Sequence, residues 1–323
     1  MVVRFGRSLT FPTPKLTPLR PSSCHVRSKS LSDRFHLDDS ISALNFWSSS
    51  SGSPSATWIS DGLAHLALLL SCLSDLLLLL SSPQTGKDPM RRLRRRSTWI
   101  DHLLNDLLLL ADLHGSFRTA LVGLHHHQSE TRAAVRRRDH ARLSSAIRSQ
   151  RRVDREISRL AAAAREVLSR SRAAPSATSS VCDEEAAFAD AVKEATAAAA
   201  SASAAVFAGI AAVSAATLAG PAKVSFPPAG DAGSGKAGSP ARVWWVVNLL
   251  RWRRRAKKRS GKKGRQADEG AVEEEKEKKR KAALERLEKL EECIRAAETG
   301  NEKVFRALVN TRVSLLNILT PSF

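Results

Sequence analysis

The sequence from residue 271 to residue 319 reads AVEEEKEKKRKAALERLEKLEECIRAAETGNEKVFRALVNTRVSLLNIL. Mostly apolar or small residues recur in it at alternating intervals of three and four, a spacing typical of a coiled-coil seam. The seam positions are Ala283, Leu287, Leu290, Ile294, Ala297, Asn301, Val304, Leu308, Thr311, Leu315 and Ile318. A helix of this length would extend roughly 70 Å at about 1.5 Å per residue, and it would not be stable alone in water. We therefore expect the rest of the chain to supply partner helices.

The composition also favours helices. Hydrophobic residues make up 42% of the 323 residues, but aromatic residues make up only 5% and Tyr is absent. The apolar residues are mostly Leu and Ala, which are strong helix formers, and few segments show the alternation of strands. The sequence predicts an all-α protein: an elongated bundle of about five helices with a long C-terminal coiled-coil-like helix and a disordered N-terminus.

Four segments follow one another in this interpretation. Residues 1–58 are rich in Ser, Pro and basic side chains and are expected to be disordered. Residues 59–219 form the helical bundle, residues 220–270 form a flexible linker with a basic block, and residues 271–320 form the long helix that packs on the bundle. An Arg- and Ser-rich start is also typical of an organelle transit peptide, although Pro at positions 12, 14, 18 and 21 would break a presequence helix.

The first bundle helix is expected to begin at a cap formed by Ser60 or Asp61. Its seam is Ile59, Leu63, Leu66, Leu70, Leu73, Leu77 and Leu80. The second has the seam Ile100, Leu103, Leu107, Leu110, His114, Phe117, Leu121 and Leu124, with Asp101, Asn105, Asp106 and Asp112 on a solvated face. We expect His114 to be packed and hydrogen-bonded. A metal site at His125, His126 and His127 is not predicted, on the expectation that they have no carboxylate or Cys partner one turn away.

Two further helices complete the bundle. Residues 130–172 are highly charged, with a thin apolar stripe of Leu143, Ile147, Ile157, Leu160, Ala164 and Leu168. Residues 182–219 have a seam of small side chains: Phe188, Val192, Ala195, Ala199, Ala202, Val206, Gly209, Val213 and Ala216. Residues 195–222 are uncharged, so a membrane span is the alternative to a bundle helix there; Ala and Ser favour insertion only weakly, which supports the bundle helix.

The net charge of +20 is concentrated in the basic block, residues 251–265, which holds ten basic and no acidic side chains. These are Arg251, Arg253, Arg254, Arg255, Lys257, Lys258, Arg259, Lys262, Lys263 and Arg265. With Trp244 and Trp245 directly before it, the block is typical of an interfacial anchor on an anionic membrane. Recognition by a nuclear import receptor and a solvated or bundle-docked segment are the alternatives. The expected location is intracellular: cytoplasmic or peripheral membrane, with the nucleus as an alternative and a plastid less favoured.

The sequence shows no pattern of residues that indicates a catalytic site. The four Cys residues are far apart without a CxxC spacing, which argues against structural zinc and a disulfide framework. The GxxxxGK[ST], GxSxG and HExxH motifs are absent. The spacing GxGxxG occurs at residues 233–238, but these lie in the Gly- and Pro-rich linker and not between a strand and a helix, as dinucleotide binding requires. We expect a non-enzymatic protein with no cofactor, metal or small-molecule substrate, which acts through helical contacts with a protein partner.

The segment Thr311-Arg312-Val313-Ser314-Leu315-Leu316-Asn317-Ile318-Leu319 resembles the closing motif of the plant BYPASS-related family almost letter for letter. Three weaker similarities come in the same order as in that family. They are HVRSKSLS at residues 25–32, LSDLL at residues 73–77, and WIDHLL at residues 99–104 followed by LADL at residues 110–113. The resemblance implies a helical plant protein without known catalytic activity, which is connected with root and shoot development.

Overall fold

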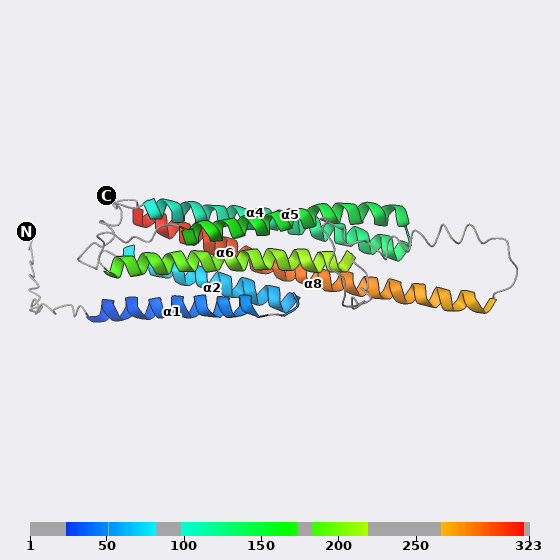
Figure 1. The fold of residues 1–323 in the computed structure, drawn as a ribbon, viewed down its shortest axis with the longest axis horizontal. Coiled ribbons are helices and arrows are strands. Elements are labelled where there is room, and N and C mark those ends of the chain that lie inside the picture. Colours follow the sequence, from blue (N-terminus) through cyan, green and yellow to red (C-terminus); the bar gives the residue numbers. More distant parts are fainter. Residues whose placement is uncertain (1–23, 51, 82–97, 174–182, 219–265, 320–323) are drawn as a thin grey trace, which may run out of the picture.

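The computed structural model describes residues 24–50, 52–81, 98–173, 183–218 and 266–319. Within these ranges the chain forms helices and no strand, which confirms the all-α prediction. The helices are α1 (Cys24–Ser49), α2 (Ala56–Ser81), α4 (Thr98–Arg137), α5 (His140–Ala173), α6 (Asp183–Leu218) and α8 (Gln266–Leu319). Figure 1 shows them side by side along one long axis, so the fold is an elongated bundle.

Helix α8 organises the bundle as its seam predicts. It has 54 residues, begins within the segment expected to be linker, and packs mainly against α2 and α4. Every predicted seam residue from Ala283 to Leu315 is buried. The polar seam residue Thr311 tolerates burial because its hydroxyl donates to the carbonyl oxygen of Leu70, 3.0 Å away. In Figure 1, α8 extends beyond the ends of α1 and α2.

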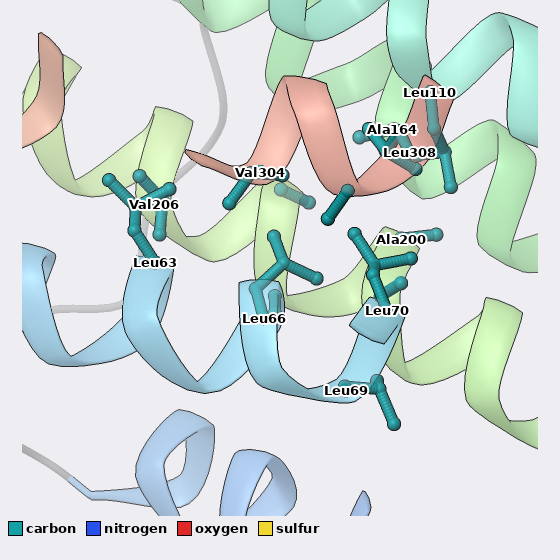
Figure 2. Close-up of a cluster of buried hydrophobic side chains, with 14 of the residues drawn as sticks. Leu63, Leu66, Leu69, Leu70, Leu110, Ala164, Ala200, Val206, Val304 and Leu308 are labelled. Carbon is teal, nitrogen blue, oxygen red and sulfur yellow. The ribbon is translucent and has the colours of Figure 1, made fainter. Parts of the chain in front are cut away.

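The centre of the core lies where α2, α4, α5, α6 and α8 meet. Figure 2 shows Leu66 and Leu70 of α2 pointing toward α8, while Leu69 points toward α1. The predicted seams of α2 and α4 are buried from Ile59 to Leu77 and from Ile100 to Leu124. Leucines at this spacing fill the space between neighbouring helices, and their removal from water supplies most of the stability of such a fold.

The prediction of disorder over residues 1–58 is wrong for residues 24–49, which form α1. Its apolar side chains recur at intervals of four and three and are buried against α2: Leu37, Ile41, Leu44 and Trp47. The Trp47 ring stacks on Trp58 at a centroid distance of 4.4 Å, and its indole nitrogen donates to the carbonyl oxygen of Trp58 at 3.0 Å. Gly62 makes this approach possible, because a Cβ there would lie 2.0 Å from the Trp47 ring.

The predicted cap of α2 is also wrong. The helix begins at Ala56, and the hydroxyl of Ser55 accepts a hydrogen bond from the Trp58 amide at 3.2 Å. A side-chain oxygen in that position satisfies an amide that has no partner within the helix. Ser60 and Asp61 instead lie within the first turns of α2.

The predicted single helix over residues 130–172 is divided in two. Residues up to Arg137 continue α4, and Arg138 has a left-handed φ of 58° that ends the helix. The carboxylate of Asp139 then accepts from the amides of Ala141 and Arg142, each at 3.1 Å, and caps α5. The apolar stripe of α5 is buried at Leu143, Ile147, Ile157 and Ala164 as predicted, whereas Leu160 and Leu168 are half-buried.

Helix α6 packs closely on α5 through small side chains, as its seam predicts. The seam is buried from Val192 to Gly209, whereas Phe188 and Val213 are half-buried and Ala216 is exposed. Hydrogen bonds add to this packing: the Gln150 side-chain amide of α5 donates to the Ser214 hydroxyl at 2.9 Å.

Candidate functional site

The closing motif, residues 311–319, forms the last turns of α8 and has a buried side. Thr311, Ser314 and Leu315 are buried against α2. The hydroxyl groups of Ser314 and Ser74 form a hydrogen bond of 2.9 Å, one helical turn from the bond between Thr311 and Leu70. This side of the motif holds α8 in register with α2.

The other side of the motif is apolar and faces solvent. Val313 is 48% exposed and Leu316 is 37% exposed, and Val309, one turn earlier, is 41% exposed. Residues at these intervals of four and three lie on one face of a helix. We call Val309, Val313 and Leu316 the α8 stripe. Sequence reasoning did not single out this stripe, although its signal was present: these apolar residues occupy positions outside the seam.

Helix α4 contributes a neighbouring apolar side chain. It runs antiparallel to α8, since His114 bonds to Asn301, whereas Gln128, farther along α4, donates to the carbonyl oxygen of Leu287, earlier in α8, at 2.8 Å. Exposed Leu108 therefore lies at about the same level of the bundle as Val309, as a rise of about 1.5 Å per residue from the His114–Asn301 pair indicates. Leu108 is thus an exposed apolar side chain at the level of the α8 stripe, on a helix that packs against α8.

A buried polar cluster surrounds His114. Its Nδ1 lies 2.6 Å from Asn301 Oδ1 and its Nε2 lies 2.9 Å from the Ser203 hydroxyl. Burial lowers the pKa of His114 to about 4, against the opposing effect of the hydrogen bond to Asn301, so the ring is neutral at physiological pH. Both nitrogens are occupied, and the expectation of a packed, hydrogen-bonded histidine is confirmed.

Asp106 departs from the expected solvated face of α4. It is buried, and its carboxylate accepts from the Ser171 hydroxyl of α5 at 2.8 Å. Asp101, Asn105 and Asp112 are exposed as predicted. The difference arises because Asp106 lies on the flank of α4 that α5 covers.

The three adjacent histidines near the end of α4 have a partner that the sequence interpretation overlooked. Glu130 lies four residues after His126 and three after His127, and its carboxylate oxygens are 3.5 Å and 3.1 Å from their ring nitrogens. The expectation that no carboxylate lies one turn away is therefore wrong. His125 is not part of this group.

One solvent-open hollow of about 290 Å³ lies between α2 and α8. Its lining consists of Ser60, Ala64, Arg295, Ala296, Thr299, Gly300 and Lys303. None of these side chains is a carboxylate or a histidine, so the hollow offers no general acid and base pair at neutral pH.

A comparison with protein-family models matches residues 62–318 to the family described as Protein BPS1. The chain belongs to the BPS1 family. The match confirms the resemblance to BYPASS-related proteins and places the chain in a family of plant developmental regulators. The matched range includes the α8 stripe and nearly all of the closing motif, whereas the similarity at residues 25–32 lies outside it. No curated protein and no solved structure matches the chain.

The basic side chains of residues 251–265, together with Trp244 and Trp245, lie outside the residues that the structure describes. The same applies to most of the predicted linker. The roles suggested for these segments in this BPS1-family protein stay predictions.

In the described part of this BPS1-family chain, three helices are long and apolar enough to cross a membrane, judged by length and composition. The stretches are Ala56–Leu78, Ile100–Arg137 and Ala187–Leu218. Within their most apolar windows, 50%, 44% and 67% of the residues respectively are buried inside the bundle. Their apolar side chains thus supply much of the bundle's own core.

Proposed function

We propose that this BPS1-family protein regulates root and shoot development without catalysing a reaction, by binding a partner helix along the α8 stripe. The observation that carries the proposal is the exposure of Val313 and Leu316 within the closing motif. A helix that needed these positions only for folding would bury them, as it buries Thr311 and Leu315. Exposed apolar side chains that lie together favour a protein contact.

The spacing of the stripe indicates the kind of partner. Side chains at intervals of four and three over two turns match the apolar face of an amphipathic helix laid along α8. Burying an exposed Val or Leu completely is worth roughly 1.5–3 kcal/mol, so three partly exposed side chains can contribute a substantial part of a specific affinity. The ion-paired Arg306 and Glu302, 3.0 Å apart, provide a polar border on which a partner's charges can be aligned.

The absence of catalysis is part of the same proposal. The buried polar cluster at His114 has both ring nitrogens hydrogen-bonded, and the hollow between α2 and α8 lacks a carboxylate and a histidine. Both features support a binding role, because general acid–base catalysis needs a titratable group that can reach a substrate.

For the location we propose the cytoplasm or a membrane surface, with the bundle facing water. The exposed faces of the apolar helices carry charged side chains such as Asp61 and Asp75 on α2 and Asp101 and Asp112 on α4. Placing such carboxylates in lipid would be unfavourable. An anionic membrane or an import receptor remains the proposed partner of the basic block.

A growth-rescue experiment tests the proposed function. Val313→Asp combined with Leu316→Asp should leave the helical circular dichroism and thermal midpoint of the purified protein unchanged, because both positions are exposed. In plants that lack the endogenous gene, this variant should fail to restore root and shoot growth. Val122→Asp on α4 is the matched control, since Val122 is 60% exposed and lies outside the stripe. Full rescue by the double variant would contradict the proposal.

A further inference from the structure

The group formed by His126, His127 and Glu130 is held at a fixed orientation on α4. Gln128, between them, is buried, and its side-chain amide donates to the carbonyl oxygen of Leu287 on α8 at 2.8 Å. Thr131 is buried on the same side of the helix. Because these two side chains fix the rotation of α4, the imidazole of His126 and the carboxylate of Glu130 lie on its exposed side, with the half-buried imidazole of His127 beside them.

The potential ligand atoms already lie close together. One ligand atom from each of the three residues lies within 4.8 Å of the others. His126 Nε2 is 3.5 Å from Glu130 Oε1, and His127 Nδ1 is 3.1 Å from Glu130 Oε2. In a tetrahedral zinc site with bonds of about 2.0–2.1 Å, neighbouring ligand atoms lie roughly 3.3 Å apart. Each of the two ring nitrogens therefore lies from one oxygen of the Glu130 carboxylate at a separation close to that between ligand atoms of a metal site.

The neighbouring charges leave the carboxylate available. Arg132, one turn away from the histidines, is engaged with Glu291 of α8 at 2.6 Å. Arg142 of α5 pairs with Asp139 at 3.5 Å. Both nearby guanidinium groups thus have carboxylate partners of their own.

We propose that His126, His127 and Glu130 form a surface binding site for a divalent transition-metal ion of the zinc class. Two imidazoles and one carboxylate suit Zn²⁺, whereas Mg²⁺ and Ca²⁺ require oxygen ligands. Three protein ligands leave a fourth tetrahedral position for water or for a ligand from a partner. This site is separate from the α8 stripe, so the proposal does not depend on the proposed function.

Calorimetric titration of the metal-free, tag-free full chain with ZnCl₂ tests the site. The wild-type protein should bind one equivalent of Zn²⁺. His126→Ala and Glu130→Gln should each lower the affinity for Zn²⁺ by about tenfold or more, since even the loss of a residue that only supports a metal ligand lowers metal affinity by about that factor. His125→Ala is the matched control, because this neighbouring histidine lies outside the group, and it should bind as the wild type does. Titration with Co²⁺ should give a tetrahedral absorption spectrum that Glu130→Gln abolishes.

Each outcome is decisive for the site. Equal affinity and stoichiometry in the wild type, His126→Ala and Glu130→Gln would overturn it, as would the absence of binding by the wild type. Loss of binding in His125→Ala to the same extent as in His126→Ala would also overturn it, because the ion would then be held by the histidine run in another way. All three substituted side chains are at least partly exposed, so circular dichroism should show an unchanged fold.

Discussion

Burial shifts the pKa values of two titratable side chains, His114 and Asp154, in opposite directions. Burial lowers the pKa of His114 to about 4 and raises the pKa of Asp154 to about 6. For Asp154 the opposing influences are a hydrogen bond with Ser214 and the charge of Arg151. Oδ1 of Asp154 and Oε1 of Gln150, one turn apart on α5, are buried without a hydrogen-bond partner in the part of the chain described. Both ionisable groups therefore favour their neutral forms in the folded protein.

These shifts predict compensating effects of pH on stability. Between pH 6.5 and about 4 the unfolded chain protonates His114 and the folded chain does not, so this residue lowers stability as the pH falls. Between about pH 6 and 3.8 the folded chain protonates Asp154 first, so that residue raises stability as the pH falls. Each effect is on the order of 3 kcal/mol, at about 1.4 kcal/mol per pKa unit.

Replacing Asp154 should reveal the pH dependence of stability that His114 causes. Asp154→Asn should stabilise the protein at pH 7, and its free energy of unfolding should then decrease by about 3 kcal/mol from pH 7 to pH 4. The wild type should change much less over the same range. Urea unfolding at several pH values measures both. A variant whose pH dependence matches that of the wild type would contradict the assignment to Asp154.

At the scale of elements, α8 depends on close contact with α2 at one point. A Cβ at Gly300 would lie 2.7 Å from both Cβ and Cδ1 of Leu63, closer than real atoms approach. Gly115 of α4 is different, since the nearest atom to its added Cβ is Phe305 Cε2 at 3.9 Å. Both glycines lie inside helices, where Ala is otherwise preferred by about 1 kcal/mol.

The two glycines therefore predict opposite results for the same substitution. Gly300→Ala should destabilise the protein by about 1–3 kcal/mol, because the backbone of α2 or α8 must move to admit the methyl group. Gly115→Ala should stabilise it by up to about 1 kcal/mol. Thermal and urea unfolding of both variants provide the comparison. Stabilisation by Gly300→Ala would show that α8 and α2 are farther apart than the structure has them.

Helix seams were predictable because their spacing is a property of the sequence alone. All the predicted seam positions of α2, α4 and α8 whose burial the structure describes are buried, including polar His114 and Asn301. The spacing did not identify which helices pair, so the contact between His114 and Asn301, 187 positions apart, required the structure. Helix α1 was missed because its few apolar residues follow a segment rich in Pro and are separated by Ser and charged residues. Glu130 was missed as a partner of His126 although the interval of four was visible.

At the scale of the whole molecule, the buried side and the exposed side of the closing motif have different roles. The buried side fixes α8 on α2 through Thr311 and Ser314, and the exposed side presents the α8 stripe. The family match reaches residue 318, so the stripe lies within the part of the chain that is characteristic of the BPS1 family. The bundle thus serves as a rigid support for the α8 stripe.

The most direct test of this account is photo-crosslinking from Val313 in plant cells. A photoreactive amino acid at position 313 should crosslink to one discrete protein, and Leu316→Asp in the same chain should abolish the adduct. The same amino acid at position 122 should give no such adduct, because Val122 is exposed outside the stripe. No adduct from position 313, or the same adducts from both positions, would contradict the claim that the α8 stripe binds a partner.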